Sequence, residues 1–179
     1  MSDPTVSVLK LLEQSGSQLH ALLLRLTLRN DAAEDLMQEL FIRLVESRGF
    51  SAAGDKLGYA RRAAINLAFN WRRTRKRRHE DATIQADPVA IEPSPLQRLI
   101  QREQLEQVLD ATRRLSDASR EAFVLRYFQQ EQYSSIARTM QRTPDQVRAL
   151  VHKAVRRITQ LLVPDNRPSA PEELSSGQE

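Results

Sequence analysis

A run of prolines and acidic residues in the middle of this sequence divides the chain into two parts. Between His79 and Pro95 lie three prolines and four carboxylates, and helices do not continue through such a run. The 179 residues leave room for two small domains around this break rather than for one large enzyme core. We therefore predict a first domain over residues 1–79, a flexible acidic linker over 80–95 and a second domain over 96–163.

The composition of both parts favours helices over sheets. The chain has 5 glycines, too few for the glycine-rich loops that bind phosphates, and it lacks the runs of β-branched and aromatic residues typical of strands. Residues 164–179 are rich in proline and serine and have little to bury, which predicts a disordered tail. We predict an all-α protein made of two small helical domains.

Composition also excludes several classes of site. The chain has no cysteine, which excludes disulfides and cysteine-bound metal centres and indicates a reducing compartment. No apolar stretch approaches the roughly 20 residues that a membrane-spanning helix needs, and the first residues lack the pattern of an export signal. The three histidines have no metal-ligand partners at workable spacing. We expect a cytoplasmic protein with no membrane insertion, no catalytic site, no metal and no cofactor.

Two amphipathic helices are expected early in the first domain. Leu19, Leu22, Leu23 and Leu26 mark the first helix, which should end near Arg29 and Asn30. Asp31 and Glu34 have the spacing of a capping box and predict the start of the second helix. The apolar stripe of this second helix consists of Leu36, Met37, Leu40, Phe41, Leu44 and Val45. Another face carries Asp35, Gln38, Glu39 and Ile42. Such a face is usually plain solvated surface, although the apolar residue within it favours a partner helix.

A strongly basic helix follows. Ser47–Leu57 contains two glycines and predicts a loop, and a long helix should begin near Gly58. Residues 59–78 contain eight arginines and lysines and no acidic residue, so a field of one sign persists there. One side of the helix carries Ala60, Ala64, Leu67 and Trp71, which we assign to core packing. Another side carries Arg62, Asn66, Asn70 and Arg73. By itself, a charge run is at least as often a solvated face as a nucleic-acid site.

The second domain contains the most specific pattern, a helix-turn-helix. Two helices are expected over 96–115 and 118–128, and a short helix over Tyr133–Met140 follows. A turn, Gln141–Thr143, then leads into a longer helix whose first residues form a capping box with proline in the first turn. The buried stripe of this helix should be Val147, Val151, Ala154 and Ile158. Its outer face carries Arg148, Ala149, His152, Lys153, Arg156 and Arg157. The second helix of such a motif can enter the major groove, although the pattern also occurs in bundles without a nucleic-acid role.

Together these residues resemble the bacterial RNA polymerase sigma factors of the extracytoplasmic-function type. The resemblance extends from about Leu19 to Leu162 and lies in three stretches, which are Asp31–Phe41, Tyr59–Phe69 with its basic continuation, and Leu115–Arg157. It implies a protein that is not an enzyme. Such a protein binds core RNA polymerase as an alternative sigma factor, directs it to a two-part promoter and assists promoter melting.

The resemblance also implies partners and residue roles. Contact with the clamp helices of the polymerase β′ subunit would come from Asp35, Gln38, Glu39 and Ile42. The separating strand of the minus-ten element would be held by Arg62, Asn66, Asn70 and Arg73, and the Ser47–Leu57 loop would take up a flipped base. The minus-thirty-five element would be bound by Arg142, Arg148, Ala149, His152, Lys153 and Arg156. Further implied partners are the β flap of the polymerase and an anti-sigma factor, and the acidic linker would thread the RNA exit region.

The sequence departs from this family in the helix-turn-helix. Gln141 stands where the turn commonly has glycine, so a left-handed residue there would be slightly strained. Ala149 and Leu150 replace a serine and an arginine that are frequent in the recognition helix, which leaves open which bases are read there.

Two other functions compete with this interpretation. The main alternative is a helix-turn-helix regulator that binds duplex operators without core polymerase and dimerises through its first domain. A helical enzyme acting on nucleic acid would need an acidic metal cluster, which the sequence lacks.

Overall fold

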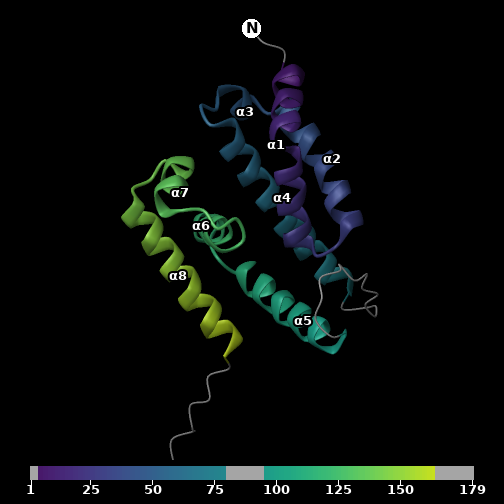
Figure 1. Cartoon of the computed structure of the whole chain (residues 1–179), viewed down its shortest axis with the longest axis vertical. Coiled ribbons are helices and arrows are strands. Elements are labelled where there is room, and N and C mark those ends of the chain that lie inside the picture. The colour runs from purple at the N-terminus through teal and green to yellow at the C-terminus, as the bar shows by residue number, and fades with distance from the viewer. Residues whose placement is uncertain (1–3, 80–94, 164–179) are drawn as a thin grey trace, which may run out of the picture.

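The computed structural model describes residues 4–79 and 95–163, and within these ranges every regular element is a helix. The first half contains α1 (Pro4–Thr27), α2 (Asn30–Glu46), α3 (Arg48–Ala52) and α4 (Lys56–His79). The second half contains α5 (Pro95–Thr112), α6 (Asp117–Tyr127), α7 (Tyr133–Met140) and α8 (Pro144–Leu162). The predicted all-α class with two helical parts is confirmed (Figure 1). The predicted linker, except for Pro95, and the predicted tail lie outside the described residues.

In the first half, α1 packs against α2 and α4 (Figure 1). The predicted leucine stripe of α1 is buried, and the helix extends beyond it to Pro4, where Val8 and Leu11 continue the buried face. α1 ends at Thr27, because Leu28 adopts a left-handed φ of 59°. The Thr27 hydroxyl donates to the Leu23 carbonyl at 2.9 Å.

The predicted capping box at the start of α2 is wrong. The helix begins at Asn30, and its N-cap is Arg29 rather than Asp31. The Asp31 carboxylate accepts from Arg29, at 3.0 Å from its Nε, instead of from the backbone of Glu34. That contact holds the pKa of Asp31 below its ordinary value. An arginine two residues upstream therefore takes the acceptor that the capping box needed.

The segment Ser47–Leu57 is not a simple loop, because it contains α3. The Ser47 hydroxyl accepts from the Phe50 amide at 3.1 Å, which caps this short helix. Phe50 is fully buried, and its ring meets that of Tyr59 edge-on with centroids 6.0 Å apart. α4 then starts at Lys56, and the Asp55 carboxylate accepts from the Gly58 amide at 2.8 Å.

The helix-turn-helix has the predicted bounds. Ile136, Ala137 and Met140 of α7 are buried, as is the predicted stripe of α8. The capping box of α8 is complete, because the Thr143 hydroxyl accepts from the Gln146 amide at 3.2 Å and the Gln146 side chain accepts from the Thr143 amide at 3.0 Å. The expected left-handed residue is present at Gln141, with φ 53° and ψ 47°.

Gln141→Gly is expected to raise the free energy of unfolding by about 0.5–1 kcal/mol. Glycine removes the cost of a left-handed backbone at this residue, which is roughly 1–2 kcal/mol. It also gives the unfolded chain more conformational freedom, which opposes this gain by roughly 0.4–1 kcal/mol. Urea denaturation measures the difference. Gln160→Gly, at an exposed position within α8, is the control and should lose about 1 kcal/mol. A lower free energy of unfolding in Gln141→Gly would contradict the proposal that the backbone is strained at Gln141.

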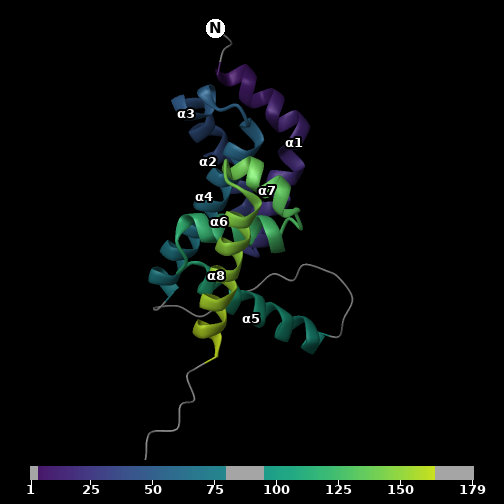
Figure 2. The same ribbon diagram turned by 90° about the vertical axis from the view of Figure 1, so that its left-hand side faces the viewer.

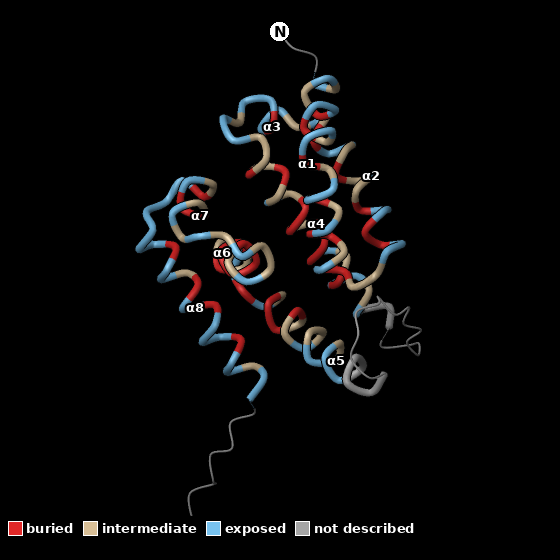
Figure 3. Tube along the Cα trace, viewed as in Figure 1, coloured by how far each residue is buried: buried red, intermediate tan, exposed pale blue. Residues whose placement is uncertain are grey.

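The cores of the two halves are joined. One cluster of buried apolar residues includes α1, α2 and α4 side chains together with Leu109, Val124, Leu125, Ile136 and Val151 from the second half. A smaller cluster in the second half contains Ala111, Leu115, Phe123, Ala154 and Ile158. α6 and α7 lie to one side of α4 in Figure 1 and in front of the first half in Figure 2, and Figure 3 shows the buried sides of the helices turned inward. α4 contacts both α6 and α7, so within the first half it is a helix that faces the second half.

Candidate nucleic-acid interface

The four polar residues predicted on α4 share one face of the helix. Their offsets of four, four and three residues place them along one line, with the buried Ala60, Ala64 and Leu67 turned away. Arg62, Asn70 and Arg73 are exposed and Asn66 is half-buried. The structure therefore brings together the residues predicted to hold the minus-ten strand, which are Arg62, Asn66, Asn70 and Arg73.

A cavity of about 370 Å³ lies against this face. One wall comes from the first half and the other from residues at the start of α6 and just before it. Its lining consists of Arg43, Asn66, Phe69, Asn70, Arg73, Arg113, Asp117 and Arg120. Four arginines against one carboxylate give the cavity a positive character suited to a phosphate-bearing ligand.

Arg62 has a buried carboxylate as its partner. Its Nε lies 2.8 Å and 3.0 Å from the two carboxylate oxygens of Glu121 in α6. The Glu121 side chain is 8% exposed and that of Arg62 is 45% exposed. Burial raises the pKa of the Glu121 carboxyl, and the Arg62 charge opposes that rise. Glu121 could not be predicted from the sequence, because nothing near it in the chain indicates its partner.

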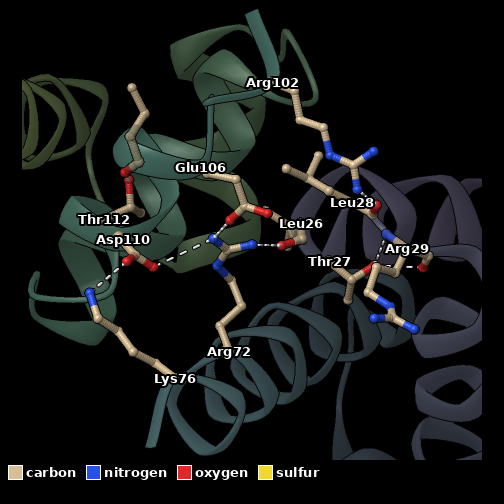
Figure 4. A network of polar contacts seen from close by, with 11 residues as sticks. Leu26, Thr27, Leu28, Arg29, Arg72, Lys76, Arg102, Glu106, Asp110 and Thr112 are labelled. Carbon is tan, nitrogen blue, oxygen red and sulfur yellow. Dashed lines mark hydrogen bonds and ion pairs between the residues drawn. The ribbon is translucent and has the colours of Figure 1, made fainter. Parts of the chain in front are cut away.

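Part of the basic run of α4 is used inside the protein. Arg72 is buried, donates to the Leu26 carbonyl at 3.2 Å and pairs with Glu106 (Figure 4). Lys76 lies 2.8 Å from Asp110, as Figure 4 also shows. Burial alone would raise the pKa of Asp110, but the Lys76 hydrogen bond and the charges of Lys76 and Arg72 outweigh it and lower that pKa. Trp71 packs on the core as predicted, and the Arg75 guanidinium lies 5.3 Å from its ring.

A second basic face lies on the outer side of the helix-turn-helix. The residues predicted there are all exposed, and they are Arg142, Arg148, Ala149, His152, Lys153 and Arg156. Arg148 contacts the Asp145 carboxylate at 2.5 Å and lies 5.5 Å from the Tyr133 ring. Since this ion pair is exposed on both sides, it costs little to break when a ligand arrives.

The third predicted face lies on α2. Asp35 and Gln38 are exposed, and Glu39 pairs with Arg43 at 2.6 Å. Ile42 is 53% exposed beside them. A large apolar side chain within a polar helix face marks a surface suited to another helix.

The described residues contain no group of three or more side chains that could hold a metal ion. In residues 4–79 and 95–163, no helix has the length and apolar character required to cross a bilayer.

Two solved structures are similar to this chain. The sigma factor RpoE of Bartonella quintana, in complex with the anti-sigma factor NepR, is 22% identical, with a TM-score of 0.46 over 87% of this chain and 96% of that one. The RsbN–BldN complex matches with 21% identity and a TM-score of 0.32, over 86% of this chain and 90% of that one.

Both halves also match family models. Residues 11–78 match Sigma-70 region 2, and residues 105–158 match Sigma-70, region 4. The ECF RNA polymerase sigma factor BldN of Streptomyces coelicolor is 30% identical over 138 residues, which cover 75% of this chain and 52% of BldN. The chain thus spans about half the length of this curated relative. With both regions present in this order, the chain belongs to the sigma-70 family, in its extracytoplasmic-function group.

Proposed function

We propose that the chain is an alternative sigma factor, without catalysis of its own, that binds core RNA polymerase and directs it to a two-part promoter. The observation that supports this most is the presence of two basic faces on separate helices, α4 and α8, in the segments that match regions 2 and 4. One face suits an opened strand and the other suits a duplex groove, as a two-part promoter requires.

The α4 face would assist melting. Taking a base out of the stack costs a few kcal/mol, which an enclosed site for the base and contacts to its backbone offset. Arg62, Asn66, Asn70 and Arg73 would bind the strand, and the α3 segment within Ser47–Leu57 would receive the base. α8 would lie in the major groove of the minus-thirty-five element, with Arg148, Ala149 and Lys153 towards the bases and Arg142, His152 and Arg156 nearer to phosphates.

The partners follow the same division. The α2 face would bind the β′ clamp helices, and the second half would contact the β flap. An anti-sigma factor is a further proposed partner, since the solved complexes of RpoE and of BldN each contain a second protein.

Transcription from genomic DNA of the encoding bacterium tests this function. Core polymerase with the purified chain should start transcripts that core alone does not, and the mapped starts should share two upstream elements. The chain without core should leave duplex operators unbound. An absence of new starts, together with operator binding by the chain alone, would instead establish a helix-turn-helix regulator.

Asp35→Ala combined with Gln38→Ala is expected to weaken binding to core polymerase about tenfold. Both side chains are exposed on α2, so their removal changes the proposed interface and leaves the core intact. Fluorescence anisotropy of the labelled chain, titrated with core, measures the affinity. Glu13→Ala with Gln14→Ala, an exposed pair on α1, is the matched control and should bind normally. Unchanged affinity in the α2 variant would remove this interface.

Arg148→Ala is expected to cost about 1–3 kcal/mol in binding of the holoenzyme to minus-thirty-five duplex and to relax one base position. The control is Arg157→Ala, which removes the same charge from the same helix at the other edge of its outer face, about 180° around the helix from Arg148. Binding to a panel of single-base variants measures both effects. Equal losses on every sequence would make Arg148 a phosphate contact rather than a base contact.

A further inference from the structure

The 370 Å³ cavity beside α4 contains more positive charge than the protein itself balances. Four arginines and one aspartate line it, which gives a net charge of +3. The aspartate, Asp117, pairs with Arg120 at 2.9 Å, but the Asp117 side chain is 85% exposed. Because water screens so exposed a carboxylate, Asp117 does little to neutralise the other cations of the cavity.

Two of the four arginines are free to bind a ligand. Within residues 4–79 and 95–163, neither Arg73 nor Arg113 forms an ion pair with a carboxylate. Arg73 is exposed and donates to the Asn70 side-chain oxygen at 3.0 Å. The Nε of Arg113 is buried and has no hydrogen-bond acceptor among the described residues. The cavity therefore has guanidinium donors for which the protein supplies no anionic acceptor.

The cations of the two walls repel one another. Arg120 is held in place, because its guanidinium donates to the carbonyls of Arg113 and Leu115 at 3.1 Å and 2.9 Å. Burial lowers the pKa of Arg120, the Asp117 carboxylate opposes that change, and the charge of Arg73 lowers the pKa further. An anion between Arg73 and Arg120 would relieve this repulsion.

Amide groups lie beside these cations. Asn66 and Asn70 of α4 both line the cavity, and Asn70 accepts from Arg73 through its oxygen, which leaves its amide nitrogen as a donor. Guanidinium and amide donors in one cavity suit the several oxygens of a phosphate group better than a halide or another small ion.

The size and the charge of the cavity favour two phosphates over one. A volume of about 370 Å³ lies at the small end of the range of about 300–1,000 Å³ that is typical of small-molecule sites. A single phosphate carries a charge of about −1.5 to −2 at neutral pH, which would leave part of the positive charge unbalanced. A diphosphate group balances more of that charge and fills more of the volume.

A second cavity, of about 360 Å³, adjoins the first. Arg43 and Asn66 belong to the lining of both. The second cavity is also lined by Tyr59 and Ala63, which provide an aromatic ring and an apolar wall for a planar group. Arg43 pairs with Glu39 at 2.6 Å, and since both side chains are about half exposed, Arg43 is free to move aside. A nucleoside attached to a diphosphate would therefore have a place beside it.

We propose that the first cavity binds the diphosphate group of a small molecule, with Arg73, Arg113 and the Asn70 amide as donors. The nucleoside of a nucleoside diphosphate would extend into the second cavity. Because Asn66, Asn70 and Arg73 also belong to the proposed minus-ten face, the ligand and the opened strand would exclude each other. That exclusion rests on the proposed function, whereas binding of the ligand needs neither polymerase nor promoter.

Isothermal titration calorimetry of the full chain, at constant ionic strength, tests the site. Pyrophosphate should bind at least about tenfold more tightly than orthophosphate. Adenosine diphosphate should bind about fivefold more tightly than pyrophosphate if its nucleoside enters the second cavity. Equal affinities for these two ligands would identify the free diphosphate ion as the ligand and support the first cavity alone. Dissociation constants above about 1 mM for both would overturn the proposal.

Asn70→Asp places a carboxylate in the cavity without changing the size of the side chain. It should weaken pyrophosphate binding at least about tenfold, because the new charge repels the ligand and an amide donor is lost. Gln160→Glu makes the same change of charge at an exposed position of α8 that lines neither cavity, and it should bind normally. Equal losses in both variants would mean that pyrophosphate responds only to the net charge of the protein, which would overturn the site.

Arginine modification by phenylglyoxal locates the ligand on the unaltered chain. Saturating pyrophosphate should slow the modification of Arg73 about tenfold, as measured by mass spectrometry of peptides. Arg138 of α7 is exposed and lines neither cavity, so its modification rate should not change. Equal protection of both arginines, or no protection of Arg73, would overturn the site.

These outcomes are separate from those that test the proposed function. A chain that starts transcription with core polymerase but binds no diphosphate would overturn the ligand site alone. A chain that binds diphosphate in the cavity but starts no transcripts would overturn the proposed function alone.

Discussion

Phe50→Ala is expected to lower the free energy of unfolding by about 3–5 kcal/mol, the usual range for emptying a buried phenylalanine site. The ring of Phe50 is fully buried and packs edge-on against Tyr59. The Lys56 ammonium lies 4.8 Å from the ring centroid and donates to the Phe50 carbonyl at 3.2 Å. One substitution therefore removes the apolar anchor of α3 and loosens the turn that leads into α4. Urea denaturation measures the loss.

The controls for Phe50 separate burial from helix content. Phe50→Leu keeps an apolar side chain and should cost less than about 1.5 kcal/mol, and the exposed Ser51→Ala should cost close to nothing. A loss below about 1 kcal/mol in Phe50→Ala would contradict the anchoring of α3. In the variant, kept folded at low temperature, promoter opening should suffer more than minus-thirty-five binding, because α3 belongs to the first half of the chain and α8 to the second (Figure 1).

Arg62→Ala is expected to destabilise the protein in a pH-dependent way, by about 2–3 kcal/mol at neutral pH. Removing one partner of a fully buried pair costs about 3–5 kcal/mol, and the loss is smaller here because Arg62 is 45% exposed. Burial already raises the pKa of Glu121 in the folded state, and loss of the Arg62 charge raises it further. A carboxyl with a raised folded pKa makes the folded state bind protons more tightly than the unfolded state. The loss should therefore be small below the ordinary value of 4.5 and grow as pH rises through the folded pKa.

Urea denaturation of wild type and variant from about pH 4 to about pH 8 tests this sign. Arg73→Ala is the matched control, because Arg73 lies on the same face of α4 but donates to Asn70 rather than to a carboxylate. The free energy of unfolding of Arg73→Ala should be only slightly lower than that of the wild type, by an amount that does not change with pH. A pH-independent loss in Arg62→Ala would mean that Glu121 reaches water in the variant, so that the buried carboxylate is not the cause.

The elements that the sequence predicted well are those whose signals are local. The capping box of Thr143 and Gln146, the proline beside it and the apolar period of α8 lie within one short stretch, and all are present. The strained residue at Gln141 follows from the same turn. The three candidate faces were also predictable, because each lies on a single helix where offsets of three and four set the direction, except for Arg142 in the turn before α8.

The features that could not be predicted from the sequence depend on contacts with other side chains or are too short to give a pattern. Asp31 has the spacing of a capping residue, yet Arg29 competes for its carboxylate. α3 has only five residues, which is too short for a periodic signal. The buried position of Arg72 depends on Glu106, 34 residues away, across the predicted linker. The wall that closes the cavity over α4 likewise comes from residues that are distant in sequence, so that no local pattern could indicate it.

The first turn of α8 has a consequence for how a duplex would be recognised. Thr143, Pro144 and Gln146 fix that turn without help from a ligand. Binding of α8 to DNA should therefore order little backbone. In a calorimetric titration, we expect no large negative change in heat capacity of the kind that accompanies folding coupled to binding. The association rate would then be limited by diffusion and electrostatic steering. DNA sequences that bind tightly would differ from those that bind weakly chiefly in how long the complex lasts.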